Sequence, residues 1–255
     1  MIKLSGVIIT YNEERYIEDC LKSLVDIVDE IIVIDSKSTD NTKNICEKYN
    51  VTFIEQEFLG YVKQKNFALK QASYDYIVSL DGDESLSHKL QESIIKLKSN
   101  WQHDGYYCNR FNNFCGQWIK YSDWYPTPKL RVFDRRKAFW DGLIVHETVS
   151  FYDKDRSKTG TLKGDILHHT YQSYSEMNLK MEQFSTLSAR SYYKLGKKSS
   201  IGKILWNPFW AFFKAYFIRL GFLDGLNGFI ICYQTGHRNF LKYTKLYELQ
   251  NKDKQ

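Results

Sequence analysis

The fold is decided by one stretch of sequence, Tyr76-Ile77-Val78-Ser79-Leu80 followed directly by Asp81-Gly82-Asp83-Glu84. The first five residues form a largely apolar run that predicts a buried strand, and the acidic residues then lie at its C-terminal end. Open α/β sheets bind their ligands at this end of the strands. Carboxylates one residue apart on a turn can point the same way, and hard oxygen ligands suit Mg2+ or Mn2+ carrying a diphosphate. Since an isolated Asp-x-Asp is usually a solvated turn, the surrounding pattern has to decide between the two interpretations.

Predicted strands and helices alternate on the N-terminal side of this stretch. Leu4 to Thr10 predicts a buried strand, and the helix that follows has apolar side chains at spacings of three and four, at Ile17, Cys20, Leu21, Leu24, Val25 and Val28. Further strands are predicted at 31–34 and 51–54, and further helices at 44–49 and 61–72. Such alternation predicts a parallel, doubly wound sheet with helices on both faces.

Acidic residues follow three of the predicted strands: Glu13 after the first, Asp35 after the second, and Asp81 with Asp83 after the fourth. The strand ends of a doubly wound sheet can gather in one crevice, so these carboxylates could share a site. Each one alone could instead be a helix N-cap or first-turn residue, which the helix dipole favours. The capping explanation is much harder to hold for all of them at once.

The composition is that of a globular chain with many aromatic residues. Its 255 residues, 43% of them hydrophobic, can build one large α/β core or one core with a smaller appendage. The five cysteines are odd in number and lack a C-x-x-C pair, which argues against a zinc site or a disulfide framework and favours reduced thiols in a cytoplasm. The sequence from Met1 shows no cleavable signal pattern. With 19 Tyr, 16 Phe and 6 Trp, some aromatic residues are expected to contact something other than the core.

Charge is distributed unevenly along the chain. Residues 1–150 carry 19 Lys and Arg against 22 Asp and Glu, a net of −3, whereas residues 151–255 carry 17 against 8, a net of +9. A weakly acidic front half and a basic, aromatic back half suggest a metal-binding catalytic part and a part that docks on anions. Because no nucleic-acid-binding module is visible, anionic lipid is the favoured partner and nucleic acid is not expected.

Four motifs of the front half together resemble family 2 glycosyltransferases of the GT-A fold: Thr10-Tyr11-Asn12-Glu13, Ile34-Asp35-Ser36-Lys37-Ser38-Thr39-Asp40-Asn41-Thr42, Gln64-Lys65-Asn66 and Asp81-Gly82-Asp83-Glu84. Four later segments are similar to the lipopolysaccharide-core β-1,4-glucosyltransferase branch of that family: Arg131-Val132-Phe133, Trp140 to Glu147, Leu167 to Tyr171 and Gly221 to Gly225. The resemblance implies an α/β GT-A catalytic domain at 1–170 with a doubly wound mixed sheet. It also implies a helical, basic and aromatic C-terminal extension at 171–255.

The resemblance implies roles for residues of a donor site as well. Glu13 and Asp35 would hold the uridine and ribose of a UDP-sugar, since carboxylates accept hydrogen bonds from N–H and hydroxyl groups. Asp83 would ligate Mn2+ or Mg2+ with Asp81 bonding the ribose or a metal-bound water, and the metal would neutralise charge on the UDP leaving group. The remaining candidates are Lys65 and Arg131 on the diphosphate and His168 as a metal or diphosphate contact. Lys65 is equally consistent with a solvated helix lysine.

Glu147 is the candidate general base, because its segment resembles the family stretch that places a carboxylate under the acceptor hydroxyl. It would take the hydroxyl proton while the oxygen attacks the anomeric carbon from the face opposite UDP, which inverts that carbon. The alternative is a surface glutamate paired with a lysine. His146, Trp124 and Trp140 are candidates for acceptor contacts, although structural packing is the commoner use of such residues.

An aromatic stripe in the back half predicts a docking helix. Its members recur at helical spacing, at Phe209, Phe212, Phe213, Tyr216, Phe217 and Leu220, and Pro208 suits the helix start. Gly221 and Gly225 suit a turn into a second helix at 226–233. Lys214 and Arg219 interrupt the apolar run, so the first helix is expected to lie in the plane of an anionic membrane surface rather than span a bilayer. The basic residues upstream would add electrostatic attraction, and they are Lys194, Lys197, Lys198 and Lys203. Packing on the catalytic domain or a homodimer seam is the alternative.

Together these inferences predict an inverting, metal-dependent hexosyltransferase. It would move a sugar, with glucose the first choice, from a UDP-sugar to a glycolipid or lipopolysaccharide-core acceptor, on the cytoplasmic face of the inner membrane. A protein or peptide acceptor stays open, because sequence encodes acceptor chemistry poorly. A non-catalytic carbohydrate-binding module is the alternative from another class, but it would have no need for the metal acids. A nucleotidyltransferase is disfavoured, because Thr10-Tyr11-Asn12-Glu13 stands where a Gly-rich phosphate loop would be expected.

Overall fold

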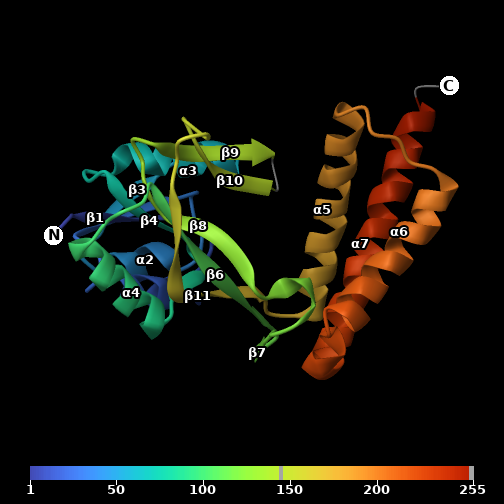
Figure 1. Cartoon of the computed structure of the whole chain (residues 1–255), viewed down its shortest axis with the longest axis horizontal. Coiled ribbons are helices and arrows are strands. Elements are labelled where there is room, and N and C mark those ends of the chain that lie inside the picture. The colour runs from blue at the N-terminus through green and yellow to red at the C-terminus, as the bar shows by residue number, and fades with distance from the viewer. Residues whose placement is uncertain (144–145, 253–255) are drawn as a thin grey trace. The chain divides into compact units, whose positions relative to one another are not determined.

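The computed structural model describes residues 1–143 and 146–252 (Figure 1). The chain divides into two compact units, one made of residues 1–111 and 127–169 and the other of residues 112–126 and 170–255. The first unit holds the large sheet, and the second holds the long helices at the C-terminal end. Because the second unit also takes in residues 112–126, the division is more complex than the single boundary at residue 170 expected from the sequence.

The sheet of the first unit has the strand order β3-β2-β1-β4-β8-β6-β11-β5. Its first half is parallel and consists of β1 (Leu4–Thr10), β2 (Glu30–Asp35), β3 (Thr52–Glu55) and β4 (Tyr76–Asp81). Its second half contains the antiparallel pairs of β5 (Glu84–Leu86), β6 (Gly105–Phe114), β8 (Thr127–Asp134) and β11 (Thr159–Tyr171). A separate antiparallel ribbon is formed by β9 (Ala138–Leu143) and β10 (His146–Phe151). The sheet is therefore mixed, and the purely parallel order predicted from alternation holds only where strands alternate with helices.

Two hydrophobic cores lie on the two faces of this sheet. In β1, Leu4 and Ile8 belong to one core, together with residues of α1 (Ile17–Leu24) and α4 (His88–Ser99). The alternate residues Val7 and Ile9 belong to the other core, together with residues of α3 (Tyr61–Gln71). Burial on both faces explains why β1 reads as a continuous apolar run instead of an alternating one. The predicted doubly wound arrangement is confirmed.

One short helix is displaced from its predicted position. The helix α2 spans Thr42–Cys46, whereas the sequence predicted 44–49. The Asp40 carboxylate accepts hydrogen bonds from the Thr42 N–H at 3.0 Å and from the Thr42 hydroxyl at 2.6 Å. These bonds satisfy orphan donors at the helix start and fix it earlier than hydrophobic periodicity indicates.

The second unit is built around three long helices, α5 (Tyr174–Lys194), α6 (Ile201–Phe213) and α7 (Gly225–Lys252). The helix α6 continues as a π-helical turn, η2 (Lys214–Ile218), and a 3-10 turn, η3 (Gly221–Asp224), leads into α7. A short strand, β7 (Gln117–Trp118), and a 3-10 turn, η1 (Ser122–Trp124), complete the unit. Figure 1 shows the three long helices side by side.

Two predictions about these helices are wrong. Pro208 lies inside α6 instead of at its start, because Ser200 caps the helix by accepting a hydrogen bond from the Lys203 N–H at 3.3 Å. The last helix continues to Lys252, far beyond the predicted end at Tyr233. Gly236 lies against α6, since a β-carbon there would lie 2.9 Å from the Pro208 carbonyl oxygen. The close approach lets α7 pack along α6.

Candidate active site

The carboxyl ends of β1, β2 and β4 lie side by side at one edge of the sheet. Thr10 pairs with Asp35 across β1 and β2, and Ile9 pairs with Asp81 across β1 and β4. With about 4.8 Å between neighbouring strands, Asp35 and Asp81 lie roughly 10 Å apart on either side of β1. The geometric part of the prediction, that these distant acids converge on one edge, is confirmed.

Gly82 lets the ends of β1 and β4 approach closely. A β-carbon at this position would lie 2.6 Å from Thr10 Oγ1 and 3.2 Å from Glu13 Cγ. Any larger residue would therefore push the two loops apart. Glu13, from the loop after β1, lies against the turn that carries Asp81 and Asp83, so the third predicted acid joins the same edge.

The loops after β1 and β2 are cross-linked by side chains of their polar motifs. The Asn12 N–H donates to Ser38 Oγ at 2.8 Å, and the Thr39 N–H donates to Asn12 Oδ1 at 2.8 Å. The buried Asp35 carboxylate accepts a hydrogen bond from the Ser38 N–H at 2.7 Å. The two motifs thus form one preorganised cradle beside the strand ends, which helix capping alone would not require.

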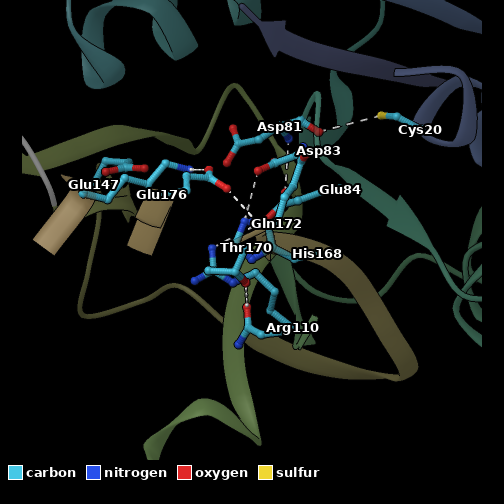
Figure 2. Close-up of polar contacts among 12 residues, drawn as sticks. Cys20, Asp81, Asp83, Glu84, Arg110, Glu147, His168, Thr170, Gln172 and Glu176 are labelled. Carbon is cyan, nitrogen blue, oxygen red and sulfur yellow. Dashed lines mark hydrogen bonds and ion pairs between the residues drawn. The ribbon is translucent and has the colours of Figure 1, made fainter. Parts of the chain in front are cut away.

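A buried ion network supports the turn after β4, and Figure 2 shows Asp81, Asp83 and Glu84 gathered on this turn. Arg131 Nη2 lies 3.2 Å from Asp81 Oδ2 and 3.1 Å from Glu84 Oε1. Glu84 is fully buried, lies 3.6 Å from Arg110 Nη1 and accepts a hydrogen bond from the Asp81 N–H at 3.1 Å. Buried charges are stable only when they are paired and hydrogen-bonded, so this network fixes the position of the turn.

Asp81 is a permanent anion. Burial alone would raise its pKa, but the nearby charges of Lys65 and Arg131 outweigh burial and hold the pKa of Asp81 well below its usual range. Lys65 Nζ lies 2.7 Å from Asp81 Oδ1. Because two cations share its charge, Asp81 is unsuited to accepting a proton at neutral pH, and it is placed to orient other groups.

Asp83 and His168 are the residues that fit a divalent cation. His168 Nε2 lies 3.3 Å from Asp83 Oδ2, and the two side chains are 12% and 21% exposed. A carboxylate oxygen suits both Mg2+ and Mn2+, and the imidazole nitrogen favours the softer Mn2+. Within residues 1–143 and 146–252, no group of three His, Cys, Asp or Glu side chains is arranged to hold a metal by itself. These cations commonly complete their ligand shells with water and substrate phosphates, so two protein ligands fit a cation that arrives with a diphosphate.

The two adjacent histidines of β11 have different surroundings. His168 pairs across the sheet with Glu84 and contacts Asp83, as described above. The His169 ring stacks on Tyr16 at a centroid distance of 4.1 Å and an angle of 9°. Burial lowers the pKa of His169. The sequence named His168 as the metal or diphosphate contact, and its side chain is the one of the two that lies beside the Asp83 carboxylate.

Glu147 is tied to the turn after β4 through Lys65. It lies on β10 with its side chain 21% exposed, and its Oε1 lies 3.5 Å from Lys65 Nζ. Asn66, the next residue of α3, braces the neighbouring strand: its Nδ2 donates to the Trp140 carbonyl at 2.7 Å, and its Oδ1 accepts from the Trp140 N–H at 3.0 Å. The Gln64-Lys65-Asn66 motif therefore links the β9–β10 ribbon to the acidic turn.

Three predicted substrate contacts are buried inside the protein. Lys65 is 2% exposed, Arg131 is 4% exposed and Trp140 is 3% exposed. The Lys65 ammonium and the Arg131 guanidinium lie 4.4 Å and 5.1 Å from the Trp140 ring centroid. These positions do not fit direct contact with a diphosphate or stacking on a sugar. They fit a supporting role, in which the two cations and the indole ring hold Asp81, Glu84 and Glu147 in place.

The other two predicted acceptor residues are Trp124 and His146. Trp124 belongs to the second unit, where its ring packs on Phe114 and Tyr171 at centroid distances of 5.9 Å and 6.0 Å. The side chain of His146 lies outside the described residues, as do Ile144 and Val145 of the predicted base segment. The acceptor role of His146 stays a prediction.

Sequence reasoning missed three residues that support the site: Glu84, Asn66 and Arg110. Glu84 and Asn66 both stood within the motifs quoted above, but nothing in a motif says which of its members is buried. Arg110 had no signal of its own, because its contact with Glu84 depends on the register of β6 in the sheet.

The fold and this edge of the sheet define a nucleotide-sugar glycosyltransferase of the GT-A type. The profile of Glycosyl transferase family 2 matches residues 5–159, and the chain belongs to this family. The sequence is similar over 259 residues to an uncharacterized glycosyltransferase of Rickettsia bellii, with 33% identity that covers 97% of this chain and 87% of the relative. It is also similar to the lipopolysaccharide core biosynthesis glycosyltransferase LpsC of Rhizobium meliloti, with 30% identity over 260 residues that cover 97% of this chain and 93% of LpsC.

A solved structure shares the fold. The mannosyltransferase PcManGT from Pyrobaculum calidifontis, in complex with GDP-Man and Mn2+, superimposes with a TM-score of 0.56 over 96% of this chain and 87% of that chain. The identity between the two sequences is 14%, so the likeness concerns the fold alone.

Proposed function

We propose that this chain is an inverting, metal-dependent hexosyltransferase that uses a UDP-sugar, with UDP-glucose as the first choice, and a glycolipid or lipopolysaccharide-core acceptor. The observation that carries the proposal is the shared strand edge: Asp35 and Asp81 end the strands on either side of β1, Asp83 follows in the turn after β4, and Lys65 ties Glu147 to that turn. This arrangement supplies both a place for a nucleotide diphosphate and a carboxylate for the acceptor.

The donor half of the proposal rests on Glu13, Asp35 and the acidic turn. Carboxylates after β1 and β2 are placed to accept hydrogen bonds from the base and ribose of a nucleotide. Asp83 and His168 would hold Mn2+ or Mg2+, and the bound cation would neutralise charge on the diphosphate leaving group. Asp81, kept ionised by Lys65 and Arg131, would orient the ribose.

The chemical step assigned to this chain is proton removal by Glu147. Its carboxylate would accept the proton of the acceptor hydroxyl while that oxygen forms a bond to the anomeric carbon and the bond from that carbon to the diphosphate oxygen breaks. Lys65 Nζ lies 3.5 Å from Glu147 Oε1 and would orient the carboxylate. Displacement from the opposite face inverts the anomeric carbon.

The acceptor half of the proposal rests on sequence similarity. Similarity to LpsC over nearly the whole chain supports a lipopolysaccharide-core acceptor, and the motifs of the back half point the same way. A protein or peptide acceptor is the second candidate, since nothing in the described residues defines an acceptor pocket.

A donor and metal screen tests the proposal. The purified full-length chain would be incubated with UDP-glucose, UDP-galactose, UDP-N-acetylglucosamine or GDP-mannose, each with Mn2+, Mg2+ or chelator, and nucleoside diphosphate release would be measured. We expect release from a UDP-hexose that requires a divalent cation. Release from GDP-mannose alone would overturn the donor assignment, and release unaffected by chelator would remove the metal role of Asp83 and His168.

A further inference from the structure

The outer face of α6 and the turn after it is aromatic and exposed. Among its 13 residues, α6 has no buried residue. Trp206, Phe209, Phe213 and Phe217, here called the aromatic ladder, follow one another with ring centroids 5.5, 6.2 and 5.1 Å apart. Their exposed fractions are 62%, 55%, 36% and 50%. A contiguous apolar face of this kind marks an interaction surface on a folded protein.

The apolar face continues around a rigid bend into α7. Leu220, Phe222, Leu223 and Leu226 are all exposed in this bend. Two glycines let the bend close: a β-carbon on Gly228 would lie 2.0 Å from the Gly221 carbonyl oxygen, and one on Gly221 would lie 2.5 Å from Cys232 Sγ. Packing this close leaves no room for the exposed leucines and Phe222 to turn inward.

Length and hydropathy set the depth at which this face could enter a bilayer. Across the described residues, no helix taken singly is long and apolar enough to cross a membrane. The segments Ile201–Ile218 and Gly221–Lys252 are long and apolar enough only when taken together, and they are bent by 72° relative to each other. A bent apolar pair with an aromatic outer face suits the boundary between headgroups and acyl chains, where Trp and Phe are favoured.

The segment that carries the ladder is basic in its own sequence, and one of its cations, Arg219, is paired with Asp123 at 3.4 Å. Residues 190–219 contain no Asp or Glu, and their basic residues are Arg190, Lys194, Lys197, Lys198, Lys203, Lys214 and Arg219. Such a segment is attracted to anionic lipid headgroups. Two copies of this face placed against each other would instead bring like charges together, which disfavours a homodimer seam.

A cluster of three cations adjoins the ladder. Lys197 and Lys242 lie over the Tyr192 ring, with Nζ 4.2 Å and 4.8 Å from its centroid. Burial and the charges of Arg238 and Lys197 lower the pKa of Lys242 to about 8. Among residues 1–143 and 146–252, no carboxylate forms an ion pair with any of the three cations. Lys197, Arg238 and Lys242 thus form a basic cluster that lacks a counter-charge within the described chain.

The basic cluster and the ladder are physically connected. Tyr243, which follows Lys242, hydrogen-bonds to Asn207, and Asn207 precedes Pro208 in α6 next to Trp206. Aromatic side chains and unpaired cations therefore belong to one continuous region of the second unit.

We propose that this region docks on an anionic lipid bilayer, with the aromatic ladder in the headgroup–acyl boundary and the basic cluster on lipid phosphates. The proposal concerns the second unit and stands independently of the donor and acceptor chosen above. It gives the chain a place to work at a membrane surface.

Vesicle binding of the full-length chain tests the proposal. Co-sedimentation would be measured with phosphatidylcholine vesicles and with vesicles that also contain phosphatidylglycerol, at low and high salt. We expect binding to the anionic vesicles that weakens with salt. The ladder variant Trp206→Gln/Phe209→Gln/Phe213→Gln should bind at least about tenfold more weakly, because three exposed apolar side chains lose their favourable transfer into the boundary.

The basic cluster has its own variant and a matched control. Lys197→Gln/Arg238→Gln/Lys242→Gln should bind anionic vesicles roughly tenfold or more weakly, since each cation near the surface contributes about fivefold in binding. The control Lys70→Gln/Lys89→Gln/Lys96→Gln removes the same charge from exposed positions of the first unit and should bind like the parent chain. Quenching of Trp206 and Trp210 fluorescence by brominated lipid would report insertion, and it should be lost in Trp206→Phe/Trp210→Phe.

Other outcomes would overturn the proposal. Equal vesicle binding by the ladder variant and the parent chain would exclude the ladder from the docking surface. Equal loss of binding in the basic variant and its control would show a general effect of net charge. A parent chain that ignores vesicles but forms a dimer, which the ladder variant converts to a monomer in sedimentation velocity, would assign the face to a second copy of this chain.

Discussion

The acidic turn of the first unit and the aromatic ladder of the second handle charge and apolar surface in opposite ways. Around the turn, Asp81, Glu84 and Arg131 are paired with one another at 3.1–3.2 Å. Around the ladder, large aromatic side chains are exposed and the cations of the basic cluster have no carboxylate partner among the described residues. Folding alone accounts for the first region, because paired charges support a precise turn. Folding alone does not account for the second region, because its aromatic side chains and cations would need a binding partner to bury or neutralise them.

The contrast teaches what substitutions should do in each region. Near the turn, a change to one partner leaves another charge buried and alone, so both stability and activity should respond. On the ladder, exposed side chains contribute little to folding, so stability should hardly change while binding does. The following predictions separate these two behaviours, from the largest expected effect to the smallest.

Glu147→Gln should have the largest effect on activity. Loss of the general base should lower kcat by roughly 100-fold to 10,000-fold, because the amide cannot accept the hydroxyl proton. The Glu147 side chain is only partly buried, and its partner Lys65 keeps its ion pair with Asp81 in the variant. The melting temperature should therefore change little. Sugar transfer would be measured beside Glu92→Gln, a glutamate whose side chain is 53% exposed. Normal turnover by Glu147→Gln would remove it from the catalytic role.

Glu84→Gln should have the largest effect on stability among the changes near the acidic turn. It removes a fully buried negative charge from between Arg131 and Arg110 and leaves these cations without their shared partner. The free energy of unfolding should therefore fall by about 3 kcal/mol. Urea unfolding would measure it. The double variant Glu84→Gln/Arg131→Met removes both partners and should lose less than the two single changes added together. Strict additivity would mean that the two side chains do not act as a pair.

Asn66→Ala should have a smaller effect that divides between stability and activity. It leaves the Trp140 N–H and carbonyl without their side-chain partner, at a cost of about 1–3 kcal/mol. The two hydrogen bonds between Asn66 and the Trp140 backbone, here called the clamp, hold the ribbon that carries Glu147. Loss of the clamp should therefore lower kcat more than it changes the KM for the donor. Asn44→Ala, at an exposed position of α2, is the matched control for urea unfolding and transfer kinetics. Unchanged kcat in Asn66→Ala would restrict the clamp to a structural role.

Much of the first unit was predictable because its signals are local. The continuous apolar runs of β1, β2 and β4 predicted strands buried on both faces, and the acids after them predicted a shared edge. The burial of Lys65, Arg131 and Trp140 was not predictable, because it depends on how β8 and the β9–β10 ribbon cover the turn. Residue type alone predicted that these three side chains contact the substrate. Long-range packing instead places them beside the carboxylates of the site.

The second unit was predictable in composition but less so in its boundaries. The aromatic stripe was visible in the sequence, but it divides in the structure. Phe209, Phe213 and Phe217 are exposed, whereas the rings of Phe212 and Tyr216 contact Phe229 of α7. Pro208 was assigned to a helix start by its usual preference, yet Ser200 caps α6 earlier and Pro208 lies in its interior. The close approach of Gly236 in α7 to the Pro208 carbonyl in α6 is a contact that no local pattern reveals.

Substitutions on the ladder should leave folding almost unchanged. Phe209→Gln alters a side chain that is 55% exposed, so the free energy of unfolding should stay within about 0.5 kcal/mol of the parent. Phe133→Ala, at a fully buried position of the first unit, should cost about 3–5 kcal/mol in the same urea experiment. A large loss in Phe209→Gln would mean that the ladder packs within the folded chain, and the contrast between the two regions would fail.

The last prediction is a rise in stability on the alkaline side. The pKa of Lys242 is lowered in the folded chain from its ordinary 10.5 to about 8. Below pH 8 the residue is protonated in both states and its charge opposes folding, and between these two values only the unfolded chain keeps the proton. The free energy of unfolding should therefore rise with pH through this window, because the unfolded state binds more protons there.

Lys242→Gln should be more stable than the parent chain at pH 7, and its free energy of unfolding should lack the part of the rise that Lys242 causes. An anionic headgroup on the basic cluster would restore the charged form of Lys242, so anionic vesicles should suppress the same share of the rise in the parent chain. An identical rise in Lys242→Gln would show that Lys242 already has a compensating charge, and the contrast with the paired acidic turn would disappear.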